Sequence, residues 1–119
     1  MKKTLIIGVS ENENRYANRV MKILIEKDYE VIAIGKKPGE VSGVKIRTKT
    51  IDIENLHTVT LYISPEIQKE YYDYIIAQKP NRVIFNPGSN NKEFQKLLEA
   101  EGIQVLNSCS LIMLTADYY

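Results

Sequence analysis

The sequence contains one cysteine and one histidine among its 119 residues, and each scarcity removes a class of function. Cys109 has no second cysteine to pair with, so the chain forms no internal disulfide, which fits a reducing compartment. With His57 as the only histidine, the His and Cys clusters that hold transition metals are missing. We therefore expect a cytoplasmic protein without a metal site, and no catalytic constellation is evident.

Charge of one sign and long apolar runs are missing as well. The 16 Lys and Arg residues nearly balance the 15 Asp and Glu residues, whereas a nucleic-acid-binding domain is usually distinctly basic. No apolar run approaches the roughly 20 residues that cross a bilayer. With 44% hydrophobic residues, the chain is expected to form one globular domain over residues 1–119 that binds neither nucleic acid nor membrane.

Short β-branched runs alternate along the chain with amphipathic ones. Five of them are predicted to be buried strands: Thr4–Val9, Glu30–Ile34, Thr58–Ile63, Arg82–Phe85 and Gln104–Leu106. Three sets of apolar residues recur at helical spacing between them: Ala17, Val20, Met21 and Leu24; Ile67, Tyr71, Tyr74 and Ile75; and Phe94, Leu97 and Leu98. The alternation predicts a single Rossmann-like, doubly wound α/β domain with a mainly parallel sheet of about five strands.

The stretch 36–55 breaks this alternation. We expect a glycine-containing loop there in place of a crossover helix, with a short extra strand around Val44–Ile46. Further along, Asn90 or Asn91 is predicted to cap a helix N-terminus, and Gly102 to end a helix.

Small or turn-forming residues follow four of the predicted strands. They are Gly8-Val9-Ser10, Gly35-Lys36-Lys37-Pro38, Ile63-Ser64-Pro65 and Asn86-Pro87-Gly88. Ligands of doubly wound sheets bind beyond the carboxyl ends of the strands, where the strand order reverses. We therefore expect these segments to border one groove.

The first of these turns has the properties of an anion site. Gly8 permits close backbone approach, and Ser10 offers a hydroxyl. The helix beginning near Arg15 presents free N–H groups and the positive end of its dipole. Arg15 and Arg19 add charge, so a pyrophosphate is the expected ligand. The alternative is a plain turn in which Gly8 only relieves a tight bend.

The second predicted strand ends in lysines rather than in an acidic residue. An NAD domain usually carries Asp or Glu about 20 residues beyond its glycines, where it binds the ribose hydroxyls. Lys36 and Lys37 instead favour a ribose that bears a phosphate, as in NADP or coenzyme A. The alternative is a solvated lysine pair on the surface.

Five segments, taken in order, resemble the small stand-alone coenzyme A-binding proteins, which are related to the CoA-binding domain of acyl-CoA synthetases and of succinyl-CoA ligase α-subunits. The segments are "IIGVSENENRYANRVMKIL", "YEVIAIGKKPGEVSGVK", "TVTLYISPEIQKEYYDYI", "RVIFNPGSNN" and "CSLIML". The "NPG" turn and "GEVSGVK" are the more specific of these, because generic Rossmann domains lack them. The resemblance covers essentially the whole chain. It implies a Rossmann-like fold that binds coenzyme A or an acyl-CoA without catalysing a reaction.

The resemblance also implies roles for single residues. The pyrophosphate would be held by Gly8, Val9, Ser10 and Arg15; the adenosine end by Gly35, Lys36 and Lys37, flanked by Ile63 and Ser64; and the pantetheine arm would be bordered by Asn86, Pro87 and Gly88. Tyr16 and Asn18 stand at the helix entry, where many relatives carry proline and serine-tyrosine. Cys109 follows the fifth predicted strand, so it could form a mixed disulfide with the thiol of the ligand. The alternative is an inert cysteine that packs against Leu111 and Met113.

Three functions are compatible with these residues. The first is non-catalytic binding of coenzyme A or acyl-CoA, as a sensor, a carrier or a redox-linked protein. The second is an NADP-dependent oxidoreductase, against which the missing second glycine and the absent catalytic dyad weigh. The third is a protein-interaction domain with a vestigial nucleotide site. A homodimer or another protein partner is compatible with each of them.

Overall fold

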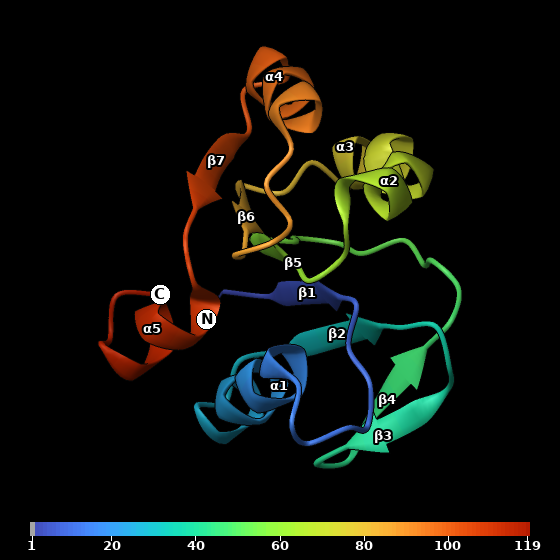
Figure 1. The fold of residues 1–119 in the computed structure, drawn as a ribbon, viewed down its shortest axis with the longest axis vertical. Helices are drawn as coiled ribbons and strands as arrows, with labels where there is room; N and C mark the ends of the chain where they lie inside the picture. Colours follow the sequence, from blue (N-terminus) through green and yellow to red (C-terminus); the bar gives the residue numbers. More distant parts are fainter. Residues whose placement is uncertain (1) are drawn as a thin grey trace.

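The strand β1 (Thr4–Ile7) lies near the middle of a sheet in the computed structural model, which describes residues 2–119 (Figure 1). The strand order is β3-β4-β2-β1-β5-β6-β7. The other strands are β2 (Val31–Ile34), β3 (Gly39–Val41), β4 (Val44–Arg47), β5 (Thr58–Leu61), β6 (Arg82–Phe85) and β7 (Gln104–Asn107). Every neighbouring pair is parallel except β3 with β4. The mainly parallel α/β sheet is confirmed, and the five predicted strands are all present.

The expected count of about five strands is wrong, because the sheet has seven. The stretch 36–55 contributes a hairpin whose strands β3 and β4 join through Ser42 and Gly43. Their φ angles of 49° and 84° suit the two-residue turns that connect antiparallel strands. β4 contains the predicted strand Val44–Ile46 and pairs with β2. β3 is a three-residue edge strand with one buried side chain, too short to show an apolar period.

Helices connect β1 to β2, β5 to β6 and β6 to β7, and a further helix follows β7. They are α1 (Tyr16–Glu26), α2 (Pro65–Gln68), the 3₁₀ turn η1 (Lys69–Tyr71), α3 (Tyr72–Gln78), α4 (Lys92–Ala100) and α5 (Ser110–Thr115). The predicted apolar face of α1 is buried as expected. Asn91, not Asn90, caps α4, because its side-chain oxygen accepts from the Phe94 N–H at 3.0 Å. The short helix α5 was not predicted, because six residues give too little periodicity.

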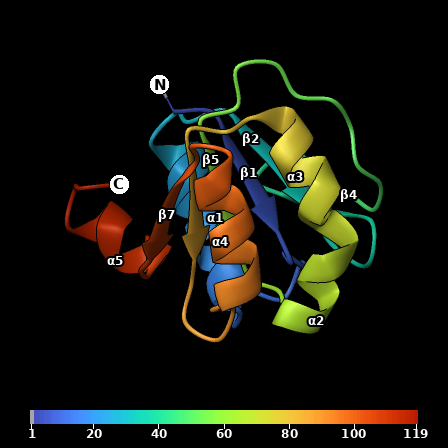
Figure 2. The same ribbon diagram turned by 90° about the horizontal axis from the view of Figure 1, so that it is seen from above.

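The helices cover both faces of the sheet, so the domain is doubly wound (Figures 1 and 2). Successive side chains of β1 alternate between the two faces. Leu5 and Ile7 pack in one core cluster with Phe94 of α4, whereas Ile6 packs in a second cluster with Met21 of α1. Within residues 2–119, no helix is both long and apolar enough to cross a membrane.

The order of the strands fixes where a ligand site can form. The chain leaves β1 through α1 to β2 on one side, and it later returns to β5 on the other side of β1. The connections therefore diverge at the carboxyl ends of β1 and β5, which leaves a crevice at that point.

Candidate functional site

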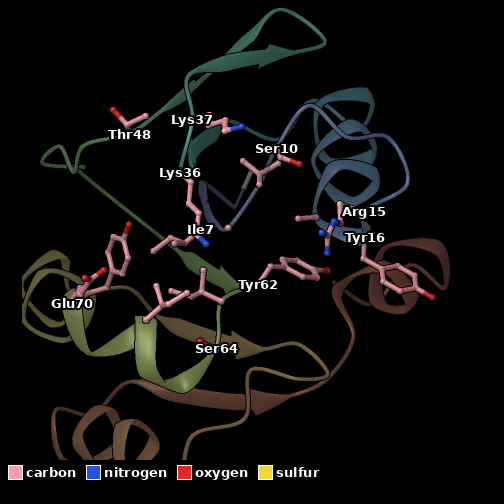
Figure 3. Close-up of a pocket in the computed structure, with 17 residues that line it drawn as sticks. Ile7, Ser10, Arg15, Tyr16, Lys36, Lys37, Thr48, Tyr62, Ser64 and Glu70 are labelled. Atoms are coloured by element: carbon pink, nitrogen blue, oxygen red, sulfur yellow. The ribbon is translucent and has the colours of Figure 1, made fainter.

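A cavity of about 870 Å³ lies at the carboxyl ends of β1, β2, β4 and β5, where the strand order reverses (Figure 3). Ten of the predicted site residues line it: Gly8, Val9, Ser10, Arg15, Tyr16, Gly35, Lys36, Lys37, Ile63 and Ser64. Seven further lining residues were not predicted: Ile7, Ala17, Thr48, Tyr62, Ile67, Glu70 and Tyr71. The fold thus brings three of the four predicted strand-end segments together.

Gly8 is required by the protein's own backbone. Its φ is +102°, and a Cβ built there would lie 2.5 Å from the Tyr62 carbonyl oxygen. Its N–H donates to the Ile34 carbonyl at 2.8 Å. A Cβ on Gly35 would likewise overlap the Val9 carbonyl. The ends of β1, β2 and β5 therefore approach one another as bare backbone, and this close packing forms the floor of the cavity.

The N-terminus of α1 is one wall of the cavity. No side chain within residues 2–119 caps the helix, and its first turn holds no acidic residue. The N–H groups of a first helical turn have no partner within the helix, so together with the dipole they favour an anion. The preceding loop is held in place by Asn18, whose buried side-chain amide donates to the Ser10 carbonyl at 2.9 Å. Arg15 adds a positive charge beside this wall.

Further positive charge follows β2. Lys36 and Lys37 lie on the lining, and Figure 3 shows them on the side of the cavity formed by the end of β2. Among residues 2–119, neither lysine forms an ion pair with a carboxylate. Arg19, which the sequence also suggested as a source of charge, does not line the cavity and lies over the Tyr16 ring instead.

The wall opposite the lysines comes from the segment after β5. Gln68 holds this segment from behind, since its fully buried amide donates to the Ile63 carbonyl at 2.9 Å and to the Ser89 carbonyl at 2.7 Å. Two tyrosines on this wall are uncharged at neutral pH. Burial, with the nearby Cys109 as a smaller cause, raises the pKa of Tyr62, and burial followed by the charge of Glu70 raises the pKa of Tyr71.

The segment Asn86–Gly88 does not line the cavity. The Asn86 side chain is fully buried and donates to Thr60 Oγ1 at 2.7 Å and to the Leu61 carbonyl at 2.9 Å. Its oxygen accepts from the Ser110 N–H at 2.8 Å. Asn86 therefore joins the ends of β5 and β6 to the start of α5. A role of Pro87 and Gly88 beside a ligand stays a prediction.

Two more predicted residues lie outside the lining. Asn18 faces the Ser10 carbonyl rather than the open cavity, as described above. Cys109 is half-buried and precedes α5 as its N-cap residue. The mixed disulfide between Cys109 and a bound thiol stays a prediction.

Four of the unpredicted lining residues lie at positions that the sequence does not mark as strand ends. Thr48 follows β4, which lies in the irregular stretch, and Glu70 and Tyr71 belong to η1. No turn signal marks these positions as strand ends. Tyr62 falls inside the predicted strand Thr58–Ile63, whereas β5 ends at Leu61, so Tyr62 belongs to the segment that follows the strand.

A doubly wound sheet with an uncapped helix and cationic side chains at its switch point defines a Rossmann-like α/β domain. Within this class, residues 2–115 match the family model described as the CoA binding domain. The chain belongs to that family.

Solved structures share the fold. An uncharacterized protein is 44% identical, with a TM-score of 0.96, over 100% of this chain and 98% of its own. A hypothetical protein from Pyrococcus horikoshii OT3 is 31% identical, with a TM-score of 0.83, over 92% of this chain and 79% of its own. The dinucleotide forming acetyl-coenzyme A synthetase 1 of Ca. Korarchaeum cryptofilum shares the fold at 14% identity and a TM-score of 0.71, over 89% of this chain and 25% of its own. No curated protein matches the sequence.

Proposed function

We propose that the protein binds coenzyme A or an acyl-CoA in this cavity and does not itself catalyse a reaction. One observation carries the proposal: in a member of the CoA binding domain family, an uncapped helix N-terminus, Arg15 and the unpaired Lys36 and Lys37 all border one cavity. A ligand with separate phosphate groups satisfies these positive groups together.

Coenzyme A carries two phosphate-containing groups, and each suits a different positive region of the cavity. Its pyrophosphate suits the α1 N-terminus with Ser10 and Arg15, because backbone N–H groups and a guanidinium both donate to phosphate oxygens. Its ribose phosphate suits Lys36 and Lys37. Both lysines line the cavity, and the apolar Ile63 lines the wall opposite them, where an uncharged part of the ligand can pack.

NADP is the competing ligand, because it too combines a pyrophosphate with a phosphorylated ribose and would use the same lysines. The two candidates differ at the other end of the molecule. NADP needs hydrogen-bond donors and acceptors around its nicotinamide, whereas the thiol-bearing arm of coenzyme A needs only a channel out of the cavity. The family membership favours coenzyme A.

Native mass spectrometry of the purified protein tests the proposal. We expect a one-to-one adduct with the mass of coenzyme A or an acyl-CoA, either retained on purification or formed when coenzyme A is added. A complex that forms with NADP and not with coenzyme A would overturn the proposal in favour of the oxidoreductase. No complex with either ligand would favour the protein-interaction domain.

A further inference from the structure

One end of the cavity differs chemically from the rest. Figure 3 shows Thr48 and Glu70 on the side of the cavity away from Arg15, with Lys37 close to Thr48 and no labelled cationic side chain beside Glu70. Ile67 and Tyr71 come from the same α2–η1 segment as Glu70 and also line the cavity. This end combines an apolar side chain, an aromatic ring, a hydroxyl and a carboxylate.

Glu70 is out of place in a cavity for phosphates. Its carboxylate accepts hydrogen bonds and donates none when ionised, and it repels a phosphate. Among residues 2–119 it forms no ion pair, although Lys69 beside it pairs with Glu66 at 3.4 Å. A ligand group that contacts Glu70 must therefore be an uncharged or cationic hydrogen-bond donor.

We propose that Glu70 determines specificity for the base of the ligand, by accepting a hydrogen bond from an exocyclic amino group. Ile67 and Tyr71 supply apolar and aromatic surface for the face of the base, and Thr48 adds a hydroxyl to the same lining. The inference rests on the proposed function, because adenine is the amino-bearing base of coenzyme A. A base with hydrogen in place of the amino group would leave Glu70 without a donor, and a base with a carbonyl there would face it with like partial charge.

Two ligands and three proteins test this inference. Calorimetry compares coenzyme A with an analogue in which hydrogen replaces the amino group of the base. For the wild type we expect the analogue to bind about tenfold more weakly, the effect of losing one hydrogen bond to a charged group. In Glu70→Ala the two ligands should bind within about twofold of each other.

Glu66→Ala is the matched control, because Glu66 lies on the preceding turn of the same segment and does not line the cavity. It should keep the tenfold preference. Glu70 is exposed, so its variant is expected to fold, and circular dichroism checks that it does.

Three results would overturn the inference. Equal affinity of the wild type for both ligands would remove base selection and leave coenzyme A binding intact. A preference that persists in Glu70→Ala would assign the selection to another group. A wild type that binds neither ligand would overturn the proposed function and the inference with it.

Discussion

The Asn18 side chain donates a hydrogen bond to the Ser10 carbonyl at 2.9 Å, and so fastens the loop after β1 to the first turn of α1. Asn18 is 1% exposed and Ser10 is exposed, so this bond is shielded from water on the Asn18 side. Ser10, which accepts this hydrogen bond, lines the cavity, and so does Arg15, which lies between Ser10 and Asn18 in the chain. The loop is thus shaped before any ligand arrives, which lowers the cost of ordering it on binding.

Asn18→Ala should weaken coenzyme A binding and lower the stability of the fold. The variant loses one part-buried hydrogen bond, which costs about 0.5–1.5 kcal/mol. Asn14→Ala is the control, because Asn14 is an exposed residue of the same loop and should change the free energy of unfolding by no more than about 0.5 kcal/mol. Urea titration and calorimetry measure both effects, and equal behaviour of the two variants would show that the tether is unimportant.

Coenzyme A should bind at least about tenfold more tightly than dephospho-CoA, because a charge-assisted contact to phosphate contributes roughly 1.5–3 kcal/mol. Replacing Lys36 and Lys37 together with Ala should remove most of this preference. Lys45→Ala serves as the control, since Lys45 lies on β4 and does not line the cavity. Equal affinities of the wild type for the two ligands would exclude the lysine pair from the site.

Gly8→Ala should destabilise the protein more than Gly88→Ala. Both glycines have positive φ, which costs a side chain about 1–2 kcal/mol. Only at Gly8 does the new Cβ meet backbone, the Tyr62 carbonyl, whereas around Gly88 the space is open. We expect the clash to add about 1–3 kcal/mol. Thermal unfolding of both variants gives the comparison, and a Gly8→Ala variant as stable as Gly88→Ala would contradict the observed packing.

The free energy of unfolding should decrease as the pH falls below about 6.5, the ordinary pKa of histidine. Burial, followed by the charges of Arg82 and Lys2, lowers the pKa of His57 from its usual 6.5. The unfolded state therefore binds more protons than the folded state around and below pH 6.5. The contribution of neutral His57 to the free energy of unfolding is fully present above that pH and declines beneath it. His57 Nδ1 lies 2.7 Å from Thr58 Oγ1, which also accepts from Arg82 Nε.

Urea unfolding of wild type and His57→Gln at pH 7.5 and pH 5 measures this dependence. Carboxylates contribute to both proteins alike, so the difference between them isolates His57. The wild type should lose more stability than the variant over this interval. An equal loss in both would show that His57 does not titrate abnormally.

The core of the site could be predicted because its residues directly follow strands with clear patterns. Gly8 and Lys36 end the runs of β1 and β2, and parallel strands place such ends at one edge. Glu70 could not be found in this way, because it reaches the cavity from η1, whose position depends on how α2 and α3 pack.

Asn86 was predicted as a site residue but does not line the cavity. It follows a correctly predicted strand, but β6 lies two strands away from β1, roughly 10 Å across the sheet. Its side chain satisfies the Ser110 N–H of α5 instead. The sequence gives no sign of this partner, because α5 is too short to be recognised from its pattern.

Calorimetric titration of the wild type with coenzyme A, set beside the same titration with NADPH, tests the central claim most directly. The two proposed phosphate-binding regions border one cavity, so we expect saturable binding of one coenzyme A per chain, tighter than the binding of NADPH. Tighter binding of NADPH, or no heat with coenzyme A at concentrations that saturate a millimolar site, would contradict it.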